Sequence, residues 1–570
     1  MTVSSAPPPV PAAPQTSPER EDLTRRSKGD GRAGLRGVVL LIALLAVLPV
    51  GLVAATVLTP DVDIWKFLWD TGLGRMVTST VTLLVGVIAL TLVIGGGLAW
   101  LVGRYRFPGQ RVFSWLLVLP FAVPAYVLGF VYVGLLDHPG PVQTWLRSTF
   151  GVDVWFPEIR SMPFAIITLS LAFYPYVYLL ARAALREQSA STYEAARVLG
   201  RGPLRTALNV VLPLARPSLA AGAALVAMET LTDYATVQYF NVETVSVGID
   251  RVWNGMYNRD AATELASLVL LFALTVIGLE RAARGRARYH QQGGSQRSVP
   301  PTRLTGWRAG AATATCLLVV GVTFVIPVVQ LIFWSSTAAL RNGQGLDPRY
   351  LSYLGNSTLV AALTAAACVV VALVVASATR LGGGTATRRF ARLATVGYAV
   401  PGPVVAIGVL VMLAALRSVM DAAGIPGGRV LVTGTLFGLI YAYVVRFLAL
   451  SVNSIDASLE KVTPSMTSAA LTLGAKPSAV VRRVHLPLVR SGVGVALVLV
   501  AVDALKELPV VLLLRPFGFE TLAIWVYQLA SESRWETAGL PALTIVAVAL
   551  VPVVLLFRRT LTDEDEGRKS

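Results

Sequence analysis

Cysteine, histidine and charged residues are all scarce in this chain of 570 residues. Its 2 cysteines and 3 histidines are far apart in the sequence, so we expect neither a disulfide framework nor a metal site. Charged residues make up 14% of the chain, whereas soluble globular domains contain roughly 25%. No lysine follows a glycine, so the Gly-Lys-Ser/Thr core of a phosphate-binding P-loop is missing from the sequence. The sequence therefore argues against a soluble protein, an ATPase and a membrane enzyme with a cluster of catalytic groups.

Apolar sequence is what the chain has in abundance, with 55% hydrophobic residues and a mean hydropathy of +0.65. A helix needs about 20 mainly apolar residues to cross the hydrocarbon core of a bilayer. We therefore predict an all-α polytopic membrane protein with about twelve transmembrane helices. The apolar runs lie near residues 36–58, 77–103, 113–136, 161–181, 213–235, 263–280, 309–334, 357–379, 393–416, 430–452, 488–514 and 539–557.

The net charge of +17 could indicate a nucleic-acid partner, but the basic residues are sorted by membrane side. With the N-terminus placed in the cytoplasm, the cytoplasmic segments carry 3 to 7 Lys and Arg each, whereas every outside loop carries 2. This is the distribution that the positive-inside rule requires. We therefore predict a multi-pass protein of the lipid bilayer, with both termini in the cytoplasm and no nucleic-acid partner.

An internal repeat divides the chain into two halves of six spans each. The stretches 194–200 and 468–474 lie 274 residues apart, and each leads to a Leu-Pro pair at the same spacing. We predict a disordered cytoplasmic tail at 1–34, the first half at 35–281, a cytoplasmic linker at 282–306, the second half at 307–560, and a cytoplasmic tail at 561–570. Two parallel halves that face each other are typical of transporters.

Each half contains a cytoplasmic loop with the sequence pattern of a short helix, a turn and a second helix. Gly200 and Gly474 occur where a left-handed C-terminal cap is expected, and Pro203 and Pro477 begin the next helix. Taken singly, these residues could have local roles only, as caps and turns. Their presence in both halves, on the same membrane side, indicates that two equivalent helices dock onto a two-fold partner.

Several charged residues fall within the predicted spans and repeat between the halves. Glu229 and Asp233 share one helical face and correspond to Asp503 and Glu507, while Lys506 is close enough to pair with Asp503. Charges inside spans are costly and usually face a cavity. Two interpretations remain open here: these residues line or gate a translocation pathway or fix a break in the helix, or they form ion pairs at the outer membrane boundary.

The paired loops resemble the "EAA" loop of permease subunits of binding-protein-dependent ABC importers. The matching residues are Glu194, Ala195, Ala196, Gly200, Val210, Leu212 and Pro213 in the first half, and Ala469, Ala470, Gly474, Val484, Leu486 and Pro487 in the second. Ser468 stands where glutamate is expected, so its contact with a partner should be weaker or different.

The resemblance implies a transport subunit of the cell (inner) membrane that is not itself an enzyme and has no cofactor of its own. Its loops would couple it to a homodimeric ATP-binding subunit on the cytoplasmic side, where ATP and Mg would bind. An external or periplasmic solute-binding protein would deliver the substrate. A secondary transporter is the rival interpretation, because parallel halves alone fit it equally well.

The substrate class follows from resemblance alone. Residues 229–240 and 506–522, and the fusion of two permease halves in one chain, resemble ferric-iron permeases. Fused importers of thiamine and aminoethylphosphonate share this plan and are the alternatives.

Overall fold

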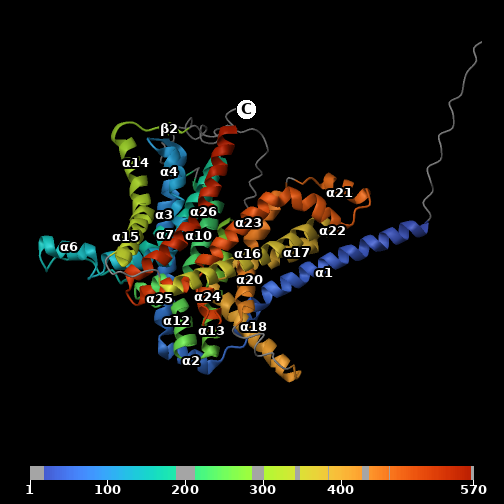
Figure 1. Cartoon of the computed structure of the whole chain (residues 1–570), viewed down its shortest axis with the longest axis horizontal. Coiled ribbons are helices and arrows are strands. Elements are labelled where there is room, and N and C mark those ends of the chain that lie inside the picture. Colours follow the sequence, from blue (N-terminus) through green and yellow to red (C-terminus); the bar gives the residue numbers. More distant parts are fainter. Residues whose placement is uncertain are drawn as a thin grey trace, which may run out of the picture.

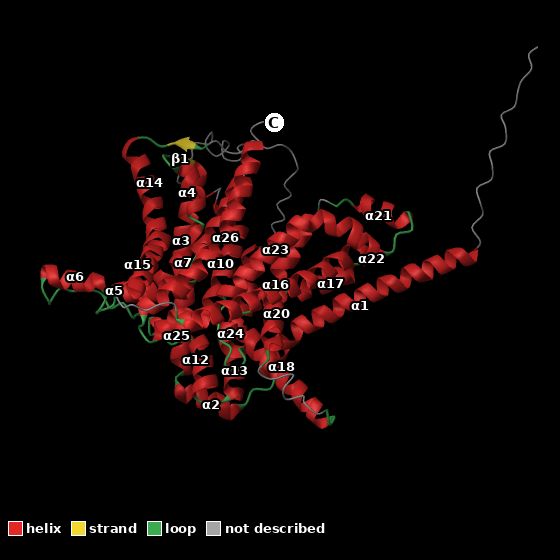
Figure 2. Ribbon diagram, viewed as in Figure 1, coloured by secondary structure: helices red, strands yellow, loops and turns green. Residues whose placement is uncertain are grey.

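The computed structural model describes the backbone of residues 18–187, 209, 212–284, 301–340, 347–382, 384–425, 435–460 and 462–566. Side chains are described over the same ranges apart from 18–33, 340, 382, 464, 477 and 555–566. Within these ranges nearly every element is a helix (Figure 2), which confirms the predicted all-α class.

The first half runs from α1 to α13 (Figure 1). Its elements are α1 (Pro18–Thr56), α2 (Val62–Thr71), α3 (Leu73–Arg104), α4 (Gln110–Leu116), η1 (Leu119–Ala122), α5 (Ala125–Leu136), α6 (Pro141–Phe150), α7 (Met162–Glu187), α10 (Leu212–Thr232), α11 (Ala235–Tyr239), α12 (Val245–Asp250), η3 (Arg251–Gly255) and α13 (Arg259–Arg284).

The second half runs from α14 to α26. Its elements are α14 (Gly306–Val320), η4 (Gly321–Val325), α15 (Ile326–Leu340), α16 (Pro348–Gly382), α17 (Thr385–Ala394), η5 (Val396–Ala399), α18 (Gly402–Ala422), α20 (Leu436–Leu459), α21 (Pro464–Thr472), α22 (Pro477–Val480), η6 (Val481–His485), α23 (Leu486–Lys506), α24 (Pro509–Leu514), α25 (Leu522–Ser531) and α26 (Trp535–Glu566). The short strands β1 (Tyr105–Arg106) and β2 (Thr302–Arg303) pair in parallel and attach the end of the linker to the first half.

Within the described residues, the number of spanning helices does not reach the predicted twelve. Ten helices of the described chain are long and apolar enough to cross a membrane, and an eleventh span arises if one bent pair counts as a unit. That pair, Gln110–Ala122 and Ala125–Phe150, bends by 89° within the run predicted as one straight helix near 113–136. Pro120 and Pro124 lie at the bend, where proline removes backbone donors and clashes with the preceding turn. The predicted span near 213–235 is the helix α10, which does not qualify, since Arg216, Glu229 and two prolines lower its apolarity.

Both ends of the described chain are helical, including part of the tail at 1–34 that was predicted to be disordered and part of the tail at 561–570. Helix α1 begins at Pro18 and includes residues 18–34, and α26 continues past residue 560 to Glu566. Proline is favoured in the first turn of a helix, and no further proline occurs between Pro18 and Pro49. The helix of the first span therefore extends on its N-terminal side to Pro18.

Equivalent helices pack in the same pattern in the two halves. Helices α3, α7 and α10 pack together in the first half, as α16, α20 and α23 do in the second. The Thr80 hydroxyl accepts a hydrogen bond from the Val245 amide (3.0 Å), and Ser357 accepts one from Leu522 (2.8 Å). These pairs are 277 residues apart in the numbering, so α12 and α25 are also equivalent elements. The internal repeat thus extends to the tertiary contacts.

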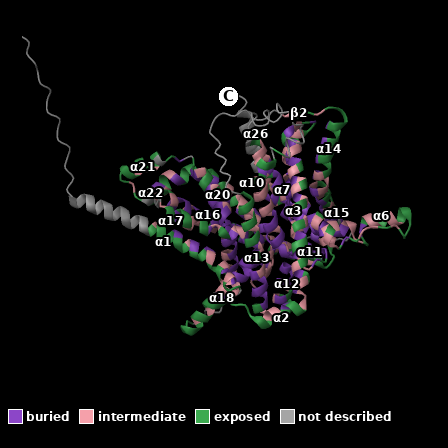
Figure 3. Ribbon diagram, turned by 180° about the vertical axis from the view of Figure 1, so that it is seen from behind, coloured by how far each residue is buried: buried purple, intermediate pink, exposed green. Residues whose placement is uncertain are grey.

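The first membrane span of each half, which is α1 in one half and the run from α14 to α15 in the other, packs across onto the opposite half. Helix α1 contacts α16, α17 and α18, whereas α15 contacts α5, where Trp334 stacks against Phe130 at 5.9 Å. The buried core is continuous between the halves (Figure 3). Away from this junction the two bundles diverge: α3, α7 and α10 run toward β2 and α14, whereas α16 and α20 run toward α21 and α22 (Figure 1).

Candidate functional site

Two helices break at equivalent positions near the junction of the halves. Helix α10 ends at Thr232 and α11 begins at Ala235, while α23 ends at Lys506 and α24 begins at Pro509. Discontinuous helices of this kind surround the binding sites of many transporters, because unwound backbone is tolerated where it lines a cavity. Pro509 fits the second break, since proline cannot continue a preceding helix without distortion.

A carboxylate at each break accepts hydrogen bonds from the freed backbone. Asp233 accepts from the Val237 amide at 3.2 Å and from the Thr236 hydroxyl at 2.7 Å. Glu507 accepts from the Val510 amide at 3.4 Å. Both carboxylates thus lie at helix breaks, whereas their role in a translocation pathway stays a prediction.

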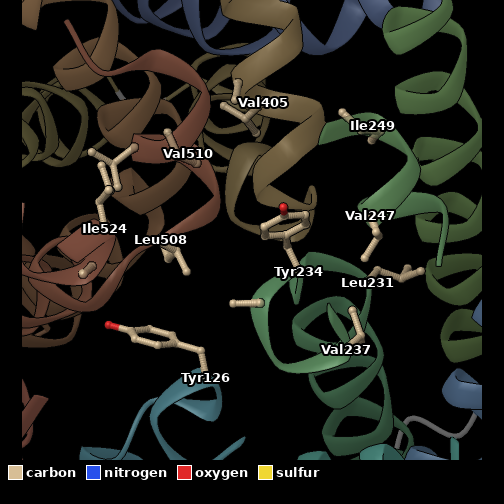
Figure 4. Close-up of a cluster of buried hydrophobic side chains, with 14 of the residues drawn as sticks. Tyr126, Leu231, Tyr234, Val237, Val247, Ile249, Val405, Leu508, Val510 and Ile524 are labelled. Atoms are coloured by element: carbon tan, nitrogen blue, oxygen red, sulfur yellow. The ribbon is translucent and has the colours of Figure 1, made fainter. Parts of the chain in front are cut away.

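A cavity of about 100 Å³ lies between the broken helices and is lined by both halves. Four of the five predicted pathway residues line it, namely Glu229, Asp233, Lys506 and Glu507. The fifth, Asp503, binds the Lys506 ammonium at 2.8 Å. Tyr126, Tyr234 and Leu508, which also line this cavity, come from three different segments (Figure 4). The structure therefore brings the predicted pathway residues together.

Arg446, which is not among the predicted site residues, also contacts this site through Glu507. Its Nε lies 3.6 Å from Oε2 of Glu507, and both side chains are more than 90% buried. Its guanidinium also donates to the Val400 carbonyl at 3.4 Å. A Cβ at Gly402 would lie 3.1 Å from both Arg446 and Glu507, so only glycine fits there without displacement. The available signal was a lone arginine in an apolar run, which needs a buried partner.

The charges around the cavity do not balance. Four carboxylates (Glu229, Asp233, Asp503 and Glu507) face two basic groups (Lys506 and Arg446), which gives a formal charge of −2 for these six side chains. Glu229 acts electrostatically on Arg446, Lys506 and Glu507, so the groups form one network. With all six ionised, the site attracts cations and repels anions.

The predicted coupling loop of the second half forms a helix, a turn and a second helix, as expected. Thr463 precedes α21, and Gly474 has a φ of +83° in the turn that follows. The Gly474 amide donates to the Leu471 carbonyl and the Ala475 amide to the Ala470 carbonyl, both at 3.1 Å. This is the Schellman arrangement of a helix C-terminus, which favours glycine.

Helix α21 is exposed along most of its length. The exposed residues include Ser468 and Ala469, and three large apolar side chains: Met466 (48%), Leu471 (41%) and Leu473 (88%). Leu486 and Pro487 are also exposed at the start of α23. None of these loop residues lines the cavity, so the structure separates the predicted coupling residues from the predicted pathway residues.

In the first half, Leu212 and Pro213 are exposed at the start of α10. Glu194, Ala195, Ala196 and Gly200 lie outside the described residues. Their predicted coupling role stays a prediction, as do the coupling and pathway roles of the other predicted site residues.

Comparison with known proteins gives three kinds of relative. Over 496 residues the chain is 28% identical to the Fe(3+)-transport system permease protein FbpB 2 of Haemophilus influenzae, a match that covers 86% of this chain and 91% of that protein. It is 29% identical over 251 residues to the sulfate transport system permease protein CysT of Salmonella typhimurium, covering 42% and 87%. It is 30% identical over 138 residues to the maltose/maltodextrin permease MalF of the same species, covering 24% and 27%.

Residues 95–281 match the family described as "Binding-protein-dependent transport system inner membrane component". This region contains the first predicted coupling loop and the first helix break. The second half repeats the same features, and the similarity to the iron permease extends through both halves. Residues 95–281 are therefore similar to the permeases of binding-protein-dependent transport systems, and the chain as a whole is similar to an iron-transport permease.

Proposed function

We propose that this chain is the transmembrane subunit of an ATP-driven importer of ferric iron, which an external solute-binding protein delivers. A separate, homodimeric ATP-binding subunit hydrolyses ATP on the cytoplasmic side, and the chain itself needs no cofactor. Both termini face the cytoplasm, in line with the distribution of basic residues.

The formal charge of −2 around the central cavity is the observation that carries the iron assignment. The named relatives include permeases for a cation, for an anion and for a neutral sugar. A buried network with two more carboxylates than basic groups favours Fe³⁺ and opposes sulfate. Thiamine, an organic cation, is the alternative substrate that this charge also admits.

The exposed apolar residues of α21 support docking to a partner. Met466 and Leu471 lie on this short helix and Leu473 directly follows it, at the side predicted to be cytoplasmic, and the described part of the chain leaves all three exposed. Apolar side chains grouped on such a helix are typical of a protein interface. We propose that the ATP-binding subunits receive this helix and its counterpart from the first half.

The divergence of the two bundles suits a mechanism of alternating access. The helices lie apart on the side predicted to be cytoplasmic and converge around the broken helices (Figure 1). ATP binding would bring the docked helices together, rotate the two halves and open the cavity toward the binding protein. Hydrolysis would return the chain to the arrangement described above.

The test is ATPase activity in vesicles that contain this chain, its ATP-binding subunit and a binding protein loaded with ferric iron. We expect stimulation by the iron-loaded binding protein and none by the empty form. Stimulation only by binding proteins loaded with sulfate or thiamine would retain the importer and refute iron. Uptake that persists without any ATP-binding subunit would instead favour a secondary transporter.

A further inference from the structure

A second polar pocket of about 460 Å³ lies beyond the central cavity, on the side predicted to face outward. Gln238, Asp250 and Arg251 line it, together with Tyr234, which also lines the central cavity. Tyr234 therefore separates two successive polar spaces. A substrate that arrives from outside reaches this residue before it reaches the carboxylates at the helix breaks.

Side-chain oxygen atoms from both halves lie close together at Tyr234, between the two pockets. The Tyr234 hydroxyl donates to Oδ2 of Asp250 at 2.7 Å and lies 2.9 Å from the Tyr527 hydroxyl. The Tyr527 hydroxyl in turn contacts Oε1 of Gln238. Tyr527 lies on α25 and Asp250 on the equivalent helix α12, so the repeat places them opposite each other. A carboxylate, two phenols and an amide oxygen thus form a chain of successive hydrogen-bond contacts, from Asp250 through Tyr234 and Tyr527 to Gln238.

The carboxylate of this group is not neutralised by a basic side chain. Arg251, the basic residue that lines the pocket, binds Glu243 at 2.8 Å, and Arg75 also approaches Glu243 at 3.7 Å. Asp250 takes part in no ion pair among the described residues, and its hydrogen bonds come from Tyr234 and Asn254. Its charge is therefore available to a cation in the pocket.

We infer that Tyr234, Tyr527, Asp250 and Gln238 form a receiving site for Fe³⁺ at the outer mouth of the pathway. Hard cations prefer oxygen ligands, and phenolate, carboxylate and amide oxygens all qualify. This inference rests on the proposed import of iron and identifies where the ion first contacts the permease. The site joins both halves, so movement of the halves would change its geometry and release the ion inward.

Binding at this site exchanges protons for the metal ion. Both phenol O–H bonds break, two protons pass to water, and two Fe–O bonds form from the phenolate oxygens, with further bonds from Asp250 and Gln238. No electron is transferred, so the iron stays ferric. The hydrogen bonds that join the two tyrosines are lost when the ion takes their place.

The experiment titrates the full-length chain in lipid nanodiscs with ferric citrate and records the visible charge-transfer band of phenolate bound to Fe³⁺. The variants are Tyr234→Phe and Tyr527→Phe, which keep the ring and remove the ligand oxygen. Tyr257→Phe is the matched control, because Tyr257 is 85% exposed in a loop on the same predicted side.

We expect the band in the wild-type chain and in the control, a weaker and shifted band in each site variant because one phenolate remains, and at least about tenfold weaker binding of Fe³⁺ in each. No band in a wild-type chain whose ATPase responds to the iron-loaded binding protein would overturn the receiving site and leave the proposed function standing. A band that is unchanged in both site variants would overturn it as well. A band without any ATPase response would support the site and refute iron import.

Discussion

The buried ion pair between Arg446 and Glu507 gives the sharpest quantitative prediction. At the observed 3.6 Å, two opposite charges attract by about 4–5 kcal/mol at an effective dielectric constant of about 20. Removing one partner leaves the other charge buried without compensation, which typically costs 3–5 kcal/mol. We therefore expect Arg446→Met to lower the free energy of unfolding by about 3–5 kcal/mol.

The assay is equilibrium unfolding of the purified chain in mixed micelles by SDS titration, followed by far-UV circular dichroism. Arg417→Met is the control, because Arg417 lies 3.7 Å from Asp421 but both side chains are substantially exposed. An exposed pair of nearly the same length should contribute less than about 1 kcal/mol. The comparison therefore isolates the effect of burial.

A double variant tests the reasoning directly. Glu507→Gln keeps an oxygen that can accept the Val510 amide and removes the charge. Arg446→Met combined with Glu507→Gln should be about 1–3 kcal/mol less destabilised than the sum of the two single variants. Strict additivity would refute an energetic coupling between these residues.

Three further predictions concern the coupling turn, a helix contact and a helix break. Gly474→Val should leave assembly intact but reduce substrate-stimulated ATPase, since the left-handed backbone costs a β-branched residue about 1–2 kcal/mol. Gly494→Val, on an exposed helical position, is the control, and equal ATPase activity of the two variants would contradict the coupling role of this turn. Gly492→Ala should lower the free energy of unfolding by about 1–3 kcal/mol, because its Cβ would lie 2.2 Å from Oγ of Ser458. Adding Ser458→Gly should restore part of the lost stability, and a thermal-denaturation series without such rescue would argue against this contact. Asp233→Asn should weaken iron uptake with little change in stability. Asp233→Ala should weaken uptake and also lower the free energy of unfolding by about 1 kcal/mol, because the hydrogen bond to the Val237 amide is lost. Identical stability of the two variants would show that this hydrogen bond is unimportant.

The features that could be predicted are those that depend on residues close together in the sequence. The coupling turn at Gly474 follows from a glycine at the end of a short helical pattern, and the break at Glu507 follows from Pro509. The bend near Pro120 and Pro124 could have been predicted in the same way, but the long apolar run concealed it. The predicted span at α10 is not among the ten, because Arg216, Glu229 and two prolines lower the apolarity of its described residues.

The sequence by itself determined that the chain lies in a membrane, that it consists of two equivalent halves, and which loops are repeated. These properties are encoded locally, in apolar runs long enough to span a bilayer and in motifs that recur at a fixed offset. Only the tertiary structure decided that α1 packs on the opposite half, that Arg446 binds Glu507, and that Tyr234 meets Tyr527 from 293 residues away. Hydropathy cannot fix such contacts, because it specifies that a helix is buried in lipid or protein but not which helix it faces.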